Sequence, residues 1–148
     1  TSDSLGKIDR GSMASDPVRD FLEQMQCSKQ LIRGGLKRLV EIWEEIVGQI
    51  EVGYKLGLDD YLNDMDGRQL LHDAMMLATV EQKKPFLERV RKADERMLKA
   101  VEPANKCLWG REIAEEEGWD EEENWWYYMK PRRANPELLE EIEGVEAT

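Results

Sequence analysis

The only histidine in this sequence, His72, is the natural candidate for a general acid or base near neutral pH. Arg68 precedes it by four residues, so the two side chains share one face if this segment is helical. An enzyme that uses an imidazole for catalysis would therefore have to build its site around this pair.

Arg68 and His72 resemble the Arg-x4–6-His motif of HEPN ribonucleases, which are all-α proteins that cut RNA as dimers. The resemblance covers five residues and implies a ribonuclease site at this pair. Only Gln69, Leu70 and Leu71 separate the two residues here, so the spacing departs from that of the family. The alternative interpretation is a polar pair on the exposed face of an amphipathic helix.

Carboxylates offer a second kind of chemistry. Glu41 shares a helix face with Glu44 and with Glu45, and Asp60 and Asp64 follow further along the chain. Such side chains could hold magnesium. They resemble the clusters of MazG-type nucleotide pyrophosphatases, which are built on a Glu-Glu-x-x-Glu pattern, but residues 44–48 read Glu-Glu-Ile-Val-Gly. We therefore expect a solvated acidic face and no metal site.

The segment from Leu62 to Asp73 resembles a calcium-binding loop, because Asp64, Asp66 and Gly67 fall at its third, fifth and sixth positions. Leu62 has no oxygen to offer at the first position, and Asp73 is shorter than the glutamate usual at the twelfth. We interpret the segment as an acidic turn in which Asp66 caps the following helix, and we expect no cofactor.

Four consecutive aromatic residues and three basic residues form an unusual C-terminal segment. Successive side chains of an α-helix are 100° apart, so four in a row cannot all face one core. We therefore predict that Trp126 or Tyr127 is partly exposed and that the segment binds a partner, since such residues are enriched in binding hot spots. The candidate binding residues are Trp125, Trp126, Tyr127, Tyr128, Lys130, Arg132 and Arg133.

The alternative is that the aromatic residues cap the end of the protein. In that arrangement Trp109, Trp119 and Trp125 would cover the core, while apolar residues of the last predicted helix pack over Trp126. Stacking on RNA is disfavoured, because an acidic stretch at 112–123 lies beside the aromatic residues.

The net charge of −11 repels nucleic acid and favours a protein partner with a basic surface, or a second copy of the chain. Basic residues gather between Lys83 and Lys99, and we expect them to pair with the acidic stretch 112–123, within one chain or between two copies. The alternative is that they bind an acidic ligand. No apolar run is long enough to cross a membrane. Cys27 and Cys107 are expected to be reduced thiols, which suggests a cytoplasmic protein.

Apolar spacing predicts an all-α fold. The clearest stripe recurs at helical spacing and consists of Leu36, Leu39, Val40, Trp43, Val47 and Ile50. Asp16-Pro17 is typical of a helix start, Gly34-Gly35 of a kink, and Pro103 of a helix end. We expect a helical bundle of about four longer helices plus a short, aromatic-rich C-terminal helical appendage.

Residues 1–12 read as a leader left by cloning, and residues 13–148 as a single all-α domain. The sequence favours a small non-catalytic interaction protein that binds a protein partner or itself through the aromatic segment. The alternative is an all-α enzyme, either a ribonuclease at Arg68 and His72 or a metal-dependent nucleotide hydrolase that uses the carboxylates.

Overall fold

The first helix within residues 16–148 begins where the sequence predicts it. In the computed structural model, which describes residues 16–148, the carboxylate of Asp16 accepts hydrogen bonds of 3.1 Å from the backbone nitrogens of Val18 and Arg19. Pro17 occupies the first helical position of α2 (Pro17–Gln24). The predicted leader at 1–12 lies outside the described residues.

The apolar stripe of the second helix is buried as predicted. α3 (Lys29–Val52) is kinked at Gly35, whose backbone angles are φ 60° and ψ −146°. All six predicted stripe residues after this kink are buried, and Trp43 is 1% exposed. The helix packs against both α4 (Leu58–Leu77) and α6 (Leu87–Ala100).

The acidic turn predicted around Asp66 does not form. α4 is one continuous helix across Asp64 and Asp66, so neither residue lies in an interhelical turn and Asp66 does not cap a helix. Both aspartates belong to α4 and are half-buried. Their carboxylates accept hydrogen bonds from tyrosines of other segments. These tertiary contacts explain why acidic residues typical of a loop occur here in a helix.

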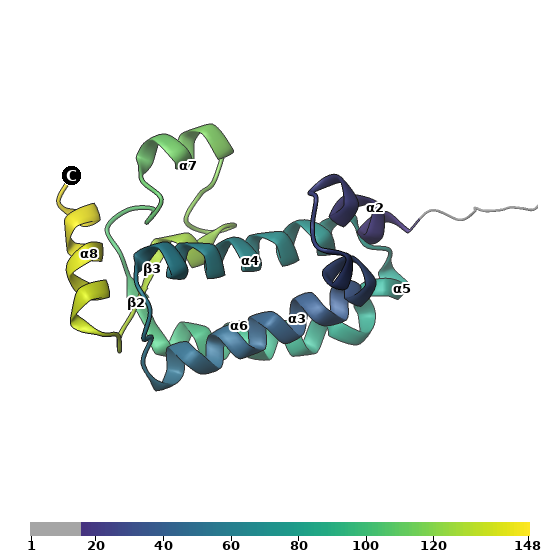
Figure 1. Ribbon diagram of the computed structural model, residues 1–148, viewed down its shortest axis with the longest axis horizontal. Helices are drawn as coiled ribbons and strands as arrows, with labels where there is room; N and C mark the ends of the chain where they lie inside the picture. Colours follow the sequence, from purple (N-terminus) through teal and green to yellow (C-terminus); the bar gives the residue numbers. More distant parts are fainter. Residues whose placement is uncertain (1–15) are drawn as a thin grey trace, which may run out of the picture.

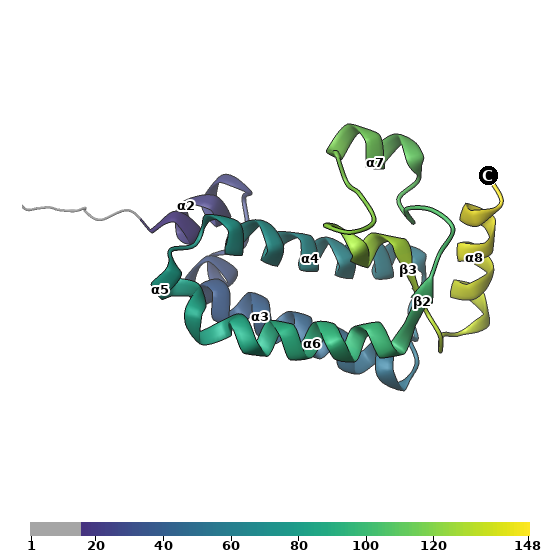
Figure 2. The ribbon, with the colours of Figure 1, turned by 180° about the vertical axis from the view of Figure 1, so that it is seen from behind.

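The three long helices lie side by side along the molecule, and Figures 1 and 2 show them from opposite sides. α5 (Val80–Lys83) and the 3-10 helix η1 (Lys84–Phe86) connect α4 to α6 at one end, next to α2. α8 (Pro136–Glu146) crosses the opposite end, and Asn135 caps its first turn. The fold is therefore largely all-α, as predicted.

The region after α6 is less helical than predicted. α6 ends at Ala100, and the next residues form strand β2 (Val101–Pro103), which pairs antiparallel with β3 (Met129–Pro131). Between residues 104 and 135 the only α-helix is α7 (Arg111–Glu117), which projects on the side of α4. The aromatic run is a 3-10 helix, η2 (Trp125–Tyr128), rather than part of an α-helix.

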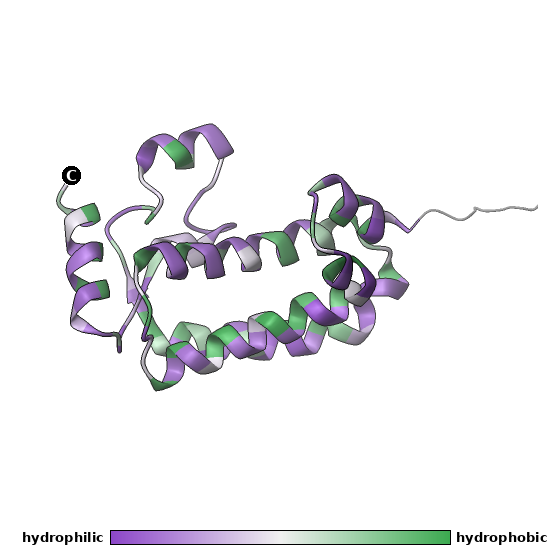
Figure 3. Cartoon of the chain, viewed as in Figure 1, coloured by the Kyte–Doolittle hydropathy of each residue, from purple (hydrophilic) through white to green (hydrophobic). Residues whose placement is uncertain are grey.

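Hydrophobic residues recur along the three long helices, whereas α7 is mostly hydrophilic (Figure 3). Within residues 16–148, no helix combines the length and the apolar character needed to cross a membrane.

Candidate binding groove

A groove of about 650 Å³ opens between α4, α7 and the segment from Gly118 to Tyr127. Its floor is fixed by Asp66, whose carboxylate accepts a 2.6 Å hydrogen bond from the hydroxyl of Tyr127 and a 3.1 Å hydrogen bond from Nε1 of Trp109. One residue of α4 thus holds two aromatic side chains that come from different segments.

Aromatic rings form one wall of the groove. Trp119 stacks on Tyr127 with ring centroids 3.9 Å apart and an angle of 18° between the planes. The hydroxyl of Tyr128 donates a 3.0 Å hydrogen bond to the carbonyl of Trp119, which fixes the backbone that carries this ring. Burial and the hydrogen bond to Asp66 raise the pKa of Tyr127 far above its ordinary value, so this phenol is neutral at physiological pH.

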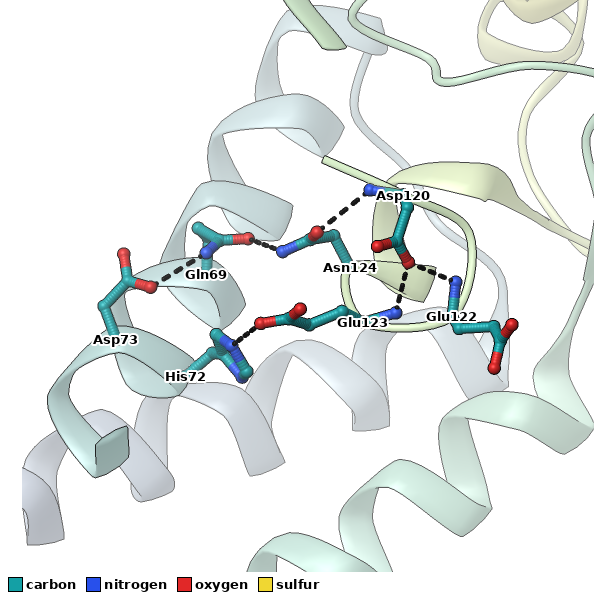
Figure 4. A network of polar contacts seen from close by, with 7 residues as sticks. All are labelled: Gln69, His72, Asp73, Asp120, Glu122, Glu123 and Asn124. Carbon is teal, nitrogen blue, oxygen red and sulfur yellow. Dashed lines mark hydrogen bonds and ion pairs between the residues drawn. The ribbon is translucent and has the colours of Figure 1, made fainter. Parts of the chain in front are cut away.

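A chain of amide side chains joins the loop to α4 (Figure 4). The buried amide of Asn124 donates a 3.0 Å hydrogen bond to Oε1 of Gln69, and Nε2 of Gln69 donates one of 3.0 Å to Asp73. Oδ1 of Asn124 accepts a 3.1 Å hydrogen bond from the backbone nitrogen of Asp120. Both sides of the groove are therefore held by hydrogen bonds within the protein itself.

Figure 4 also shows the contact between His72 of α4 and Glu123, with 3.3 Å between Nε2 and Oε2. The carboxylate of Asp120 accepts hydrogen bonds of 2.9 and 2.8 Å from the backbone nitrogens of Glu122 and Glu123, which shapes the turn that presents Glu123. The ring of His72 lies beside Trp126, with centroids 5.5 Å apart.

The groove is negatively charged. Four carboxylates line it, and His72 is the only titratable base among its described lining residues, which include no lysine or arginine. These carboxylates belong to Asp66, Asp73, Glu117 and Glu123. Glu117 and Glu123 are exposed and face water, so their charge is available to a ligand at the rim.

The two candidate catalytic residues do not lie together on an exposed face. Arg68 is 7% exposed, and its guanidinium binds Asp94 of α6 through contacts of 3.1 and 2.8 Å. The same guanidinium lies over the ring of Trp126, 4.3 Å from its centroid. The prediction of an exposed polar pair is therefore wrong for Arg68. His72 lines the groove.

The predicted exposure of the aromatic run is also wrong. Trp126 and Tyr127 are each 1% exposed, and Trp125 and Tyr128 are half-buried. A 3-10 helix also spreads successive side chains around its axis, so both rings are buried because other segments cover η2 on more than one side. Trp126 faces Arg68 and His72 of α4, while Tyr127 is covered by Trp119. Neither ring is free to bind a partner directly.

The basic residues after the aromatic run point to other partners. Lys130 binds Glu146 of α8 with both contacts at 3.0 Å, and Arg132 approaches Glu102 at 3.3 Å. Arg132 and Arg133 are exposed. The structure thus separates the predicted binding residues into a buried aromatic part and a basic part at the end of the bundle.

The candidate metal ligands are dispersed. On α3, Arg38 approaches both Glu41 and Glu45, and Arg89 binds Glu44 with contacts of 3.0 and 2.5 Å.

On α4, the hydroxyl of Tyr54 donates a 2.6 Å hydrogen bond to Asp64, and Asp60 is exposed. Within residues 16–148, no three histidine, cysteine, aspartate or glutamate side chains are grouped to hold a metal ion.

Within one chain, the paired arginines between Lys83 and Lys99 do not bind the acidic stretch 112–123, so this prediction is wrong for them. Arg89 and Arg96 bind Glu44 and Glu51 of α3 instead, and Arg91 binds acids of its own helix. The acidic stretch consequently keeps most of its charge, with Glu112, Glu115, Glu116 and Glu117 all exposed on α7. Pairing between two copies stays a prediction.

Sequence reasoning missed most of the groove. The sequence presents Asp66 as a helix cap or a calcium ligand, Asp73 as a calcium ligand, and Trp109 and Trp119 as covers for the core. One available signal was the pair of tryptophans that flank an acidic segment between Trp109 and Trp119, since this pattern places aromatic and negative side chains close together. Comparisons with family models, curated proteins and solved structures gave no match, so geometry alone carries the functional argument.

Proposed function

We propose that this protein is a non-catalytic binding protein whose groove holds a basic segment of a partner protein. The observation that carries the proposal is the combination of aromatic walls and four carboxylates in one groove of about 650 Å³. This volume lies within the range of about 300–1,000 Å³ typical of ligand sites. It suits one or two long side chains with part of their backbone.

Electrostatics favours a cationic occupant. Lysine or arginine side chains entering the groove would meet Asp66 and Asp73 on its α4 side and Glu117 and Glu123 at its rim. The net charge of the whole chain, −11, would attract the same partner from a distance. A phosphate backbone would be repelled by both fields, which argues against nucleic acid in this groove.

The aromatic walls favour the same occupant. A guanidinium or ammonium group gains energy over the face of a tryptophan or tyrosine ring, and its aliphatic stem can pack against the ring edges. Trp109 is 38% exposed and Trp119 is half-buried, so both retain accessible surface. Arg68 over Trp126 is an example of this type of contact inside the protein.

The hydrogen bonds around the groove favour tight binding. Asp66 already holds Tyr127 and Trp109, and Asn124 is fixed on both sides. A site whose walls are ordered before binding loses less conformational entropy when the ligand arrives. The free thiols of Cys27 and Cys107 suit a reducing compartment, so we place this function in the cytoplasm.

Titration calorimetry with a short lysine- and arginine-rich peptide tests the proposal, with acidic and uncharged peptides of equal length as references. We expect the basic peptide alone to bind, and its affinity to fall as salt rises. Replacing both rim carboxylates, Glu117→Gln with Glu123→Gln, should weaken binding about tenfold, in line with the loss of two ion pairs near a surface.

A matched control separates the groove from the overall charge. Glu140→Gln with Glu143→Gln removes the same charge from exposed positions of α8 and should leave the affinity nearly unchanged. Trp109→Ala should weaken binding, whereas Leu139→Ala, at a residue of equal exposure on α8, should not. Equal effects of groove and control variants, or no binding of the basic peptide at low salt, would refute the proposal. Sedimentation velocity without peptide shows whether a second copy takes this place.

A further inference from the structure

A cluster of positive side chains lies at the end of the bundle where α3 and α6 terminate. We call it the basic corner and define it as Arg96, Lys99, Arg132 and Arg133. All four line one cavity of about 250 Å³ together with Glu51 of α3. Two of them come from the last turns of α6 and two from the segment after β3, so the fold unites residues that are distant in the sequence.

The backbone of the basic corner is held in place from two sides. The nitrogen of Arg132 donates a 3.0 Å hydrogen bond to the carbonyl of Ala100, at the last residue of α6. The carbonyl of Arg133 accepts a 2.9 Å hydrogen bond from the nitrogen of Tyr54, just after α3. These contacts bring the two arginines to the ends of both helices and fix the positions from which their side chains extend.

Only part of the positive charge is balanced within the described residues. Arg96 binds Glu51 with contacts of 3.1 and 2.6 Å, and Arg132 approaches Glu102 through one contact of 3.3 Å. Within residues 16–148, Lys99 and Arg133 have no ion-pair partner. Four cations therefore face two carboxylates at this corner.

The helix ends account for some of this excess. A helix carries roughly half a negative charge at its C-terminus, and both α3 and α6 end here, as Figure 1 shows. Together they amount to about one negative charge. The corner remains positive on a chain whose net charge is −11, so its sign needs a further explanation.

We propose that the basic corner binds a phosphoryl group. Phosphate carries about −1.5 to −2 charges at neutral pH and presents several acceptor oxygens. Guanidinium groups present paired donors that match these oxygens, and the ammonium group of Lys99 adds a compact charge. The cavity is below the usual size range for drug-sized ligands, which suits one small anionic group.

This inference is independent of the proposed function. The basic corner and the groove differ in charge, in lining residues and in position along the bundle, and no residue lines both. Failure of basic peptides to enter the groove would leave the phosphoryl site untouched, and the reverse also holds.

The test is a titration of the full chain with inorganic phosphate, followed by amide chemical shifts and compared with chloride at the same ionic strength. We expect phosphate to shift the amide signals around Lys99, Arg132 and Arg133 with a millimolar dissociation constant, while chloride does not. Lys99→Gln with Arg133→Gln should weaken phosphate binding at least tenfold. The control, Lys92→Gln with Arg111→Gln, removes two exposed cations elsewhere and should change it less than twofold.

Two further ligands identify the source of the phosphoryl group. If a phosphoserine peptide or a nucleoside monophosphate binds more tightly than inorganic phosphate, with shifts at the same residues, the natural ligand is a phosphoryl group attached to that kind of molecule. Weaker binding of both indicates free phosphate. The proposal is overturned if no phosphate-bearing ligand exceeds chloride, or if the shifts lie away from the basic corner. Shift mapping on the unchanged chain decides this even where the double variant fails to fold.

Discussion

Arg68 of α4 and Asp94 of α6 form an ion pair inside the bundle, with the arginine side chain 8% and the aspartate side chain 20% exposed. Oδ1 of Asp94 also accepts a 2.8 Å hydrogen bond from Nε1 of Trp43 on α3. The pair therefore links three helices, and the guanidinium also packs on the ring of Trp126. Arg68 is the only buried arginine within residues 16–148, and it lies between the core and the aromatic run.

Removing one partner of this pair should destabilise the protein strongly. We expect Arg68→Met to lower the free energy of unfolding by about 3–5 kcal/mol, because it leaves the carboxylate of Asp94 in the interior without its counter-charge. Urea unfolding at neutral pH measures this loss. The double variant Arg68→Met with Asp94→Asn should recover much of it, since the amide oxygen still accepts from Trp43. A double variant as unstable as the single one would contradict this account.

The aromatic run should behave as core rather than as a free surface. We expect Trp126→Ala to cost about 3–5 kcal/mol, the usual range for removing a buried aromatic side chain. Trp109→Ala, at a tryptophan that is 38% exposed, should cost about 1 kcal/mol or less. Thermal unfolding followed by circular dichroism compares the two. Equal losses would mean that Trp126 is not packed as the structure places it.

Two glycines of α3 should respond to alanine with opposite signs. Gly35 has φ 60° and ψ −146°, a conformation that alanine adopts only with strain, so Gly35→Ala should cost about 1–3 kcal/mol. Gly48 lies in the regular helix, and an added Cβ would meet only Nη2 of Arg96 at 4.0 Å. Gly48→Ala should therefore stabilise the protein by about 0.5–1 kcal/mol. Urea unfolding of both variants checks the pair, and a loss at Gly48 would contradict the packing described.

The hydroxyl of Tyr54 should make the free energy of unfolding fall as the pH rises above the ordinary tyrosine pKa. Burial, followed by the hydrogen bond to Asp64, raises the pKa of Tyr54 in the folded protein above its ordinary value of 10.0. The stability that this hydroxyl contributes is complete below pH 10. It is lost as the pH rises further, because the unfolded chain releases this proton first. Tyr54→Phe should cost about 1.5–3 kcal/mol at neutral pH through loss of a hydrogen bond to a charged group.

The cost of Tyr54→Phe should then shrink by about 1.4 kcal/mol for each pH unit above the ordinary tyrosine pKa. Guanidinium unfolding of both proteins near neutral pH and one unit above that pKa measures the difference. Leu139→Ala, which changes no titratable group, is the control and should show a cost that does not vary with pH. A constant cost of Tyr54→Phe would show that this hydroxyl titrates normally in the folded protein.

The parts of the fold that local pattern determines could be predicted from the sequence. The stripe from Leu36 to Ile50 is buried, the kink falls at Gly35, and Asp16 caps its helix. Each of these features depends on residues within one or two helical turns, where apolar spacing and capping chemistry are decisive.

The groove could not be predicted because its contacts join distant segments. The local sequence around Asp66 is typical of a turn, and the hydrogen bonds that Tyr127 and Trp109 donate to it cannot be read from that sequence. Trp126 is one of four consecutive aromatic residues that cannot all face one core, and it is buried because the guanidinium of Arg68 on α4 covers its ring. An arginine that serves as a packing surface for two tryptophans is also invisible to a hydropathy pattern, which assigns it to solvent.

The backbone of Tyr54 has both of its polar groups satisfied by residues made much later, since its nitrogen donates to Arg133 and its carbonyl accepts from Asn135. During synthesis on the ribosome, the α3–α4 hairpin therefore emerges with this connection unpaired. Buried backbone groups need partners, and closing a long loop to supply them costs entropy. The helical hairpin can form while the chain is still growing, but this end of the bundle can close only after residues 133–135 have left the exit tunnel.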